Sequence, residues 1–380
     1  MTTYKSLEGF ATRDGTRVYA KNANAIGIPD AHFKDFDGLK LSSIGMGTYL
    51  GNPSAEDDNA VEDAVFKSIN SGAVNVIDTA INYRAMRSEK SIGRALLRMV
   101  EENLITRDQV FVATKNGYIT NDGDFPTVDV MEYMQKMYIS SGVISASDIS
   151  SGHNVMNPGY LARCIDKSLT NMHLSTIDLV YIHNAFESWN QDVDRETFMS
   201  MLSSAFETYE KYQSLGKIRY YGMATWTCFR AKPSEAEYLS LEACVNAAER
   251  VGGKGHGFKF IQLPYNLAYS EALLLRNQCV GSEKNLTILE AASRLGVGVF
   301  TSIPLFQGRL LQANVPDFGG QTEIVPKLLQ IVRSTPSVIA PLVGHKKAQH
   351  VEENLKIAKH PPLAADAFSE TVKVLTSQQA

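Results

Sequence analysis

The chain has 380 residues and a formal net charge of −4. Such a length fits two or three ordinary domains, or one α/β barrel enlarged by insertions. The weak net charge favours neither nucleic acid nor an anionic membrane as a partner, and no apolar run is long enough to span a bilayer. The N-terminus lacks the basic and apolar regions of a secretory signal, so we expect a cytoplasmic protein.

The cysteines are too far apart in the sequence to suggest a metal site or a disulfide framework. None belongs to a CxxC motif or lies near a pair of histidines; the four are Cys164, Cys228, Cys244 and Cys279. We therefore expect reduced cysteines that pack in the interior, and no metal.

Strand and helix patterns alternate along the chain. Short apolar, β-branched runs predict strands at residues 42–48, 74–78, 110–114, 176–182, 218–223, 260–263, 297–302 and 337–343. Amphipathic patterns predict helices at residues 60–71, 88–102, 159–172, 195–215, 233–251, 287–295, 327–335 and 348–358. Eight such pairs predict a closed (β/α)8 TIM barrel in a single domain, residues 41–358. An open doubly wound sheet is the alternative, but residues 45–51 lack the GxGxxG spacing that it usually carries.

Three segments fall outside this alternation. Residues 1–40 form an N-terminal extension, in which 34–40 predict a hairpin that caps the bottom of the barrel. Residues 116–157 are a long polar insertion after the third strand, where barrel loops build the active face, so we expect a lid; a surface excursion is the alternative. Residues 359–380 form a tail that is helical over 364–375 and either covers the barrel or frays.

Side chains with acid–base chemistry follow three of the predicted strands. Asp78 ends one strand and Tyr83 lies in the loop after it, while Lys115 and His183 end the next two. The carboxyl ends of barrel strands share one face, so we expect these four residues at one rim. An unpaired buried carboxylate is strongly unfavourable, which predicts a cation beside Asp78.

Each of these residues also has a simpler explanation. The lysine could reach solvent, the aspartate could cap a helix or pair with Arg84 or Arg87, and the tyrosine and histidine could be packing residues. Their joint occurrence at successive strand ends favours a functional site over four separate accidents.

Several short motifs occur in one order along the chain. They are Asp78 to Tyr83, Ser88-Glu89, Gly93, Ala95-Leu96, Thr114-Lys115, His183-Asn184, Gln262 to Asn266, Pro304 to Gly308 and Gly344 to Asn354. In this order, each at its expected strand end, they resemble the aldo-keto reductase superfamily over residues 41–358. The N-terminal extension, the insertion and the tail have no counterpart in the resemblance.

The resemblance implies an enzyme that reduces an aldehyde or ketone, a sugar being one candidate, with a nicotinamide cofactor as hydride donor. Tyr83 would donate the proton, and Lys115, held by Asp78, would lower the pKa of the tyrosine. His183 would hydrogen-bond the substrate oxygen. The substrate would be a small carbonyl compound; its identity, the direction of reaction and the oligomeric state stay open.

The resemblance also assigns cofactor contacts. They are Gly47, Thr48, Asp78, Asn184, Gln262, Pro304, Leu305, Gln307, Gly308, Gly344, Lys346, His350, Glu353 and Asn354. His345, Lys346 and Lys347 crowd the start of the last barrel helix, where the helix dipole disfavours cations, so an anion would relieve them; a solvated basic patch is the alternative. Lys346 stands where relatives often carry an arginine for the 2′-phosphate. We therefore expect NADPH, with NADH as a weaker alternative.

The sequence departs from the superfamily pattern at the nicotinamide end. Residues 222–226 replace a common Ser-Asn pair, and Ser302 replaces an aromatic residue, for which Trp226 is the expected substitute. Two other functions stay open: a lyase that uses Lys115 as a Schiff-base nucleophile, and a nicotinamide-binding regulatory subunit.

Overall fold

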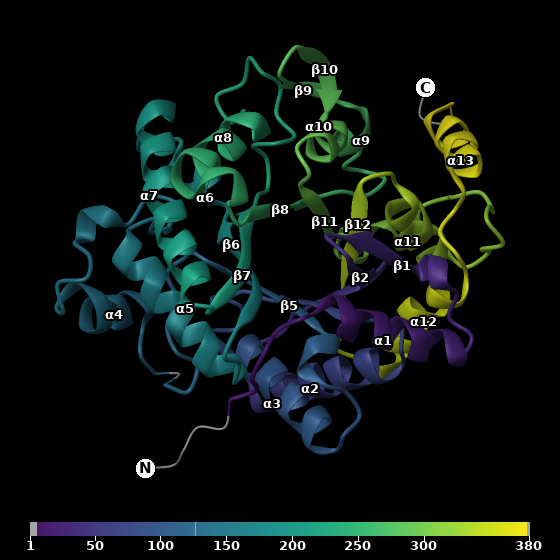
Figure 1. Ribbon diagram of the computed structural model, residues 1–380, viewed down its shortest axis with the longest axis horizontal. Helices are drawn as coiled ribbons and strands as arrows, with labels where there is room; N and C mark the ends of the chain where they lie inside the picture. The colour runs from purple at the N-terminus through teal and green to yellow at the C-terminus, as the bar shows by residue number, and fades with distance from the viewer. Residues whose placement is uncertain (1–5, 126, 378–380) are drawn as a thin grey trace.

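The computed structural model describes residues 6–125 and 127–377 and contains a closed parallel barrel. Figure 1 shows the strands at the centre with helices around them. The barrel strands are β3 (Gly45–Gly47), β4 (Val76–Asp78), β5 (Phe111–Asn116), β6 (Ile177–His183), β7 (Ile218–Ala224), β8 (Phe258–Pro264), β11 (Gly298–Ser302) and β12 (Val338–Gly344). They pair in chain order and close where β12 meets β3. The predicted (β/α)8 barrel is confirmed.

Helices surround the strands and bury one apolar face each. They are α2 (Ala55–Asn70), α3 (Arg87–Glu101), α5 (Pro158–Met172), α7 (Arg195–Ser214), α8 (Leu241–Gly252), α10 (Ile288–Arg294), α11 (Ile324–Ser334) and α12 (Ala348–Leu355). In α3, for example, Ile92, Leu96 and Met99 recur at helical spacing and are fully buried. The predicted helix 233–251 begins only at Leu241, because the Ser240 side chain caps it there.

The N-terminal extension closes the bottom of the barrel. It consists of α1 (Arg13–Ala25), which the sequence analysis missed, and the hairpin of β1 (Phe33–Phe36) and β2 (Leu39–Ser42). Asp37 and Gly38 form the predicted turn with positive φ. Phe36 packs against the ring of Phe260 inside the barrel, 4.6 Å between centroids. The expected strand 42–48 is therefore two elements, since residue 42 belongs to the hairpin and only Gly45–Gly47 to the barrel.

The insertion after β5 packs mainly on the outside of the barrel, which favours the surface excursion over the lid. Its helix α4 (Val130–Met134) and the π-helical turn Gln135–Ile139 lie beside α5 at the periphery (Figure 1). The rings of Tyr138 and Tyr160 lie 4.9 Å apart and join the turn to α5. Buried Asp122 fastens the start of the insertion, since it accepts hydrogen bonds from Lys90 and Lys167.

The remaining α-helices and strands lie outside the barrel repeat. They are α6 (Ala185–Trp189), α9 (Glu271–Leu274), the hairpin of β9 (Arg276–Val280) and β10 (Glu283–Thr287), and α13 (Ala365–Ser377). The predicted tail helix is α13, and its Phe368 packs against Leu328 and Ile331 of α11. The β9–β10 hairpin was missed. It leaves Cys279 exposed, contrary to expectation, while the other three cysteines are buried. Within the described chain, no helix has both the length and the apolar character needed to cross a membrane.

Candidate active site

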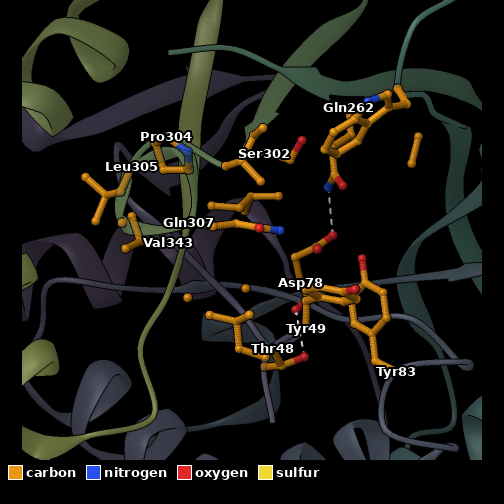
Figure 2. A pocket seen from close by; sticks show the side chains of 18 of the residues that line it. Thr48, Tyr49, Asp78, Tyr83, Gln262, Ser302, Pro304, Leu305, Gln307 and Val343 are labelled. Atoms are coloured by element: carbon orange, nitrogen blue, oxygen red, sulfur yellow. Dashed lines mark hydrogen bonds between the residues drawn. The ribbon is translucent and has the colours of Figure 1, made fainter. Parts of the chain in front are cut away.

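A buried ion pair lies at the carboxyl ends of β4 and β5. The Nζ atom of Lys115 donates to Oδ2 of Asp78 at 2.5 Å and to the carbonyl of Thr79 at 2.8 Å. Gln262 on β8 donates to the second carboxylate oxygen at 2.9 Å (Figure 2). Asp78 is thus neither a helix cap nor a partner of Arg84, which pairs with Asp58 instead. Because Lys115 is only 1% exposed, it does not reach solvent.

Tyr83 and His183 lie beside this ion pair. The Lys115 ammonium is 4.8 Å from the centre of the Tyr83 ring, and the rings of Tyr83 and His183 meet edge to face at 5.8 Å. A second tyrosine, Tyr118, approaches His183 at 4.9 Å, again edge to face. The four predicted acid–base residues therefore occupy one rim, as expected from their positions at strand ends.

Burial and the lysine charge determine the protonation of this group. Burial alone would lower the pKa of Lys115, but Asp78 and Tyr83 raise it above its ordinary value, so the ammonium persists. Burial raises the pKa of the Tyr83 phenol, and the Lys115 charge opposes this shift, as expected, without reversing it. Burial and the lysine charge lower the pKa of His183 well below its ordinary value, which leaves a neutral imidazole.

A cavity of about 610 Å³ opens in front of these residues. Its volume is in the range of small-molecule sites. The predicted site residues that line it are Gly47, Thr48, Asp78, Tyr83, His183, Asn184, Gln262, Pro304, Leu305, Gln307, Gly308, Gly344, His350, Glu353 and Asn354. Figure 2 shows Asp78 and Tyr83 on one side and Pro304, Leu305 and Gln307 on the other. Lys115 lies behind Asp78, and Lys346 lines a smaller adjoining cavity.

The expected cluster of three cations at the start of α12 is not present. His345 is buried, accepts a hydrogen bond from Nδ2 of Asn354 at 3.0 Å and forms a second one with Oγ of Ser68 at 2.8 Å, and burial lowers its pKa to about 4. It is therefore a neutral core residue. Lys346 forms an ion pair with Asp57 in the first turn of α2. Sequence spacing could not reveal a partner that lies so far away in the chain.

Three aromatic residues that the catalytic predictions did not include complete the wall. Tyr49, Tyr118 and Trp226 line the cavity. Trp226 is held by Glu187, whose carboxylate accepts its backbone N–H at 2.8 Å. The aromatic surface expected from Trp226 is therefore part of the cavity wall. Tyr118, from the start of the insertion, gave no separate signal because loop tyrosines are common in any sequence.

The cavity has features that suit a dinucleotide. Gly47 and Gly344 leave its floor without side chains, and Gln307 and Gly308 take positive φ in the loop after β11. Buried Asn82 Oδ1 and His183 Nδ1 have no hydrogen-bond partner within the described chain. Among the described residues, no group of three or more acidic, histidine or cysteine side chains is arranged to hold a metal ion.

Comparisons with known proteins agree with this architecture. An aldo-keto reductase from Klebsiella pneumoniae, in complex with NADP and acetate, is 18% identical with a TM-score of 0.57, over 90% of this chain and 95% of its own. A holo-form aldo-keto reductase from Bacillus halodurans is 17% identical with a TM-score of 0.58, over 90% of this chain and 95% of its own. A search of curated proteins found no match. The model of the Aldo/keto reductase family matches residues 43–332, and the chain belongs to this family.

Proposed function

We propose that the protein reduces an aldehyde or ketone to an alcohol with a nicotinamide cofactor, and that Tyr83 donates the proton. The observation that carries the proposal is the group at the strand ends: a charged lysine, held by Asp78, contacts a tyrosine that lies beside a neutral histidine in the wall of one cavity. This combination supplies an acid, a charge that stabilises its conjugate base, and a neutral hydrogen-bond donor.

NADPH is the proposed cofactor, and it would supply the hydride that adds to the carbonyl carbon. Its support is the cavity itself and two solved structures of similar fold, both aldo-keto reductases from Klebsiella pneumoniae, one in complex with NADP and one in complex with NADPH. Asn184 and Gln262 would hold the nicotinamide end. Pro304 to Gly308 would contact the phosphates, and Glu353 and Asn354 the adenine. NADH stays an alternative.

Proton donation and orientation of the substrate are assigned to separate side chains of the protein. The phenol of Tyr83 gives its proton to the carbonyl oxygen, and the Lys115 ammonium stabilises the phenolate that remains. His183, being neutral, orients the same oxygen by donating a hydrogen bond without adding a charge. Tyr49, Tyr118 and Trp226 line the cavity and offer aromatic surface to the substrate, which favours aromatic or apolar carbonyl compounds over sugars.

The Schiff-base alternative is not supported. A lysine nucleophile must lose its proton, yet Asp78 holds Lys115 as an ammonium that donates to two oxygens. A regulatory nicotinamide-binding role would need the cavity but not the paired lysine, the tyrosine and the histidine together. Their presence favours catalysis.

The test combines binding and turnover. The protein is titrated with NADPH and NADH by calorimetry, and oxidation of each nucleotide is followed with aromatic aldehydes, sugars and ketosteroids. We expect micromolar nucleotide binding and turnover with aromatic aldehydes. Binding without turnover of any carbonyl would favour the regulatory role, and trapping of a carbonyl compound on the protein by borohydride would favour the lyase.

A further inference from the structure

An ion pair joins two loops at one end of the cavity. Asp57, in the first turn of α2, accepts a hydrogen bond from Nζ of Lys346, which directly precedes the N-cap of α12. The Asp57 side chain is 12% exposed and that of Lys346 is 30% exposed. Partial burial makes the pair stronger than an ordinary surface contact, because water screens it less.

Asp57 has a second anchor that does not depend on the lysine. Its other carboxylate oxygen accepts the backbone N–H of Asn52 at 2.5 Å, and the carbonyl of Asn52 accepts from Arg84 at 3.0 Å. The hydrogen bond from Lys346 and that from Asn52 both lower the pKa of Asp57. The carboxylate therefore stays charged and in place when the lysine turns away.

The lysine lies where the proposed cofactor would end. Lys346 lines a cavity of about 130 Å³ that shares Gly47, Thr48 and Gly344 with the large one. The large cavity extends to Glu353 and Asn354 on α12, the proposed adenine contacts. A phosphate on the adenosine ribose would thus approach Lys346 while that lysine is engaged with Asp57.

We propose that Asp57 sets the nucleotide preference by competing with the 2′-phosphate for Lys346. The inference rests on the proposed function, since it concerns the same cofactor. A free lysine would favour the 2′-phosphate about ten- to a hundredfold through a charge-assisted hydrogen bond. In the wild type, Lys346 must give up its hydrogen bond to Asp57 before it can bind the 2′-phosphate. The Asp57 carboxylate that is left then repels the phosphate dianion. The wild-type preference for NADPH over NADH is therefore below about tenfold.

The test uses adenosine 2′,5′-bisphosphate and AMP, which differ only in the 2′-phosphate that Lys346 would meet, with dissociation constants from calorimetry. Asp57→Asn should tighten binding of the 2′,5′-bisphosphate about tenfold and change binding of AMP by less than about twofold. Glu56→Gln is the matched control, because it removes the same charge from the same helix turn at an exposed residue. It should tighten the 2′,5′-bisphosphate by less than about threefold.

A double-mutant cycle locates the effect at the lysine. In a Lys346→Ala background, Asp57→Asn should increase the affinity for the 2′,5′-bisphosphate clearly less than it does in the wild type. Without the lysine, the substitution removes only the repulsion between the Asp57 carboxylate and the 2′-phosphate. Thermal melting checks folding, and Asp57→Ser, which keeps an acceptor for the Asn52 N–H, replaces Asn if that variant unfolds. Equal tightening of both nucleotides, no tightening, or an equal effect of Glu56→Gln would overturn the inference. If the wild type binds neither NADPH nor NADH, the proposed function fails and the inference falls with it.

Discussion

At the scale of single residues, the Asp78–Lys115 pair contributes both to the stability of the fold and to the proposed function. Both side chains are nearly inaccessible to water, so neither tolerates loss of the other. Lys115→Met should lower the free energy of unfolding by about 3–5 kcal/mol, because it leaves an uncompensated buried carboxylate. Urea denaturation measures this loss. Adding Asp78→Asn should recover part of it, and an additive further loss in the double variant would show that the two residues do not depend on each other.

The protonation states predict an unusually flat pH dependence. His183 has a lowered pKa and stays neutral, while Tyr83 has a raised pKa and keeps its proton. At saturating nucleotide, kcat for reduction should be constant from about pH 6 to about pH 9 and fall as pH rises through the tyrosine pKa. A fall in kcat with a midpoint near pH 6.5, the ordinary pKa of histidine, would contradict the assignment of a neutral His183.

The site residues that could be predicted from the sequence are those whose role depends on their position at a strand end. Asp78, Lys115 and His183 each end a buried strand, and barrel geometry brings such positions together without further information. The sequence could not predict the state of His345 or the partner of Lys346. Those depend on Ser68 and Asp57, which the fold brings from another helix.

At the scale of elements, the insertion after β5 lies beside the site and contacts it through residues near its two ends. Asn154, near its end, donates to the backbone carbonyl of His183 at 2.9 Å, and Tyr118, near its start, lines the cavity. The middle of the insertion, with α4, contacts α5 instead. Polar composition and position after a strand predicted a long loop correctly. They could not show which side of the barrel rim the loop packs against.

This arrangement changes what shortening the insertion should do. Replacing residues 130–148 by a short glycine–serine turn, with Tyr118 and Asn154 kept, should leave the Michaelis constants for the carbonyl and the nucleotide within about twofold of wild type. Steady-state kinetics measure both, and Tyr118→Ala serves as a positive control that should raise the constant for the carbonyl. A large rise for the shortened variant would restore the lid interpretation.

At the scale of the whole molecule, the two ends of the barrel are specialised. The N-terminal hairpin fills the bottom with Leu39 and Leu41, which pack in one cluster with Phe111, Phe260 and Phe300. The loops at the opposite end build the cavity. The alternation of strand and helix patterns along the chain predicted this barrel. Each strand is buried on both faces and reads as an apolar run, and each helix is buried on one face and reads as amphipathic. The α1 helix and the β9–β10 hairpin lie outside that repeat, so the pattern gave no reason to expect them.

The central claim is that Tyr83 donates the proton in a nicotinamide-dependent reduction. It is tested most directly by the single-turnover rate of NADPH oxidation with the carbonyl compound that the wild type reduces fastest, compared between wild type and Tyr83→Phe. The substitution removes one hydroxyl, so the dissociation constant for NADPH should stay within about twofold while the rate falls by roughly 10²–10⁴. A variant that binds NADPH normally and turns over within about threefold of the wild-type rate would contradict the claim.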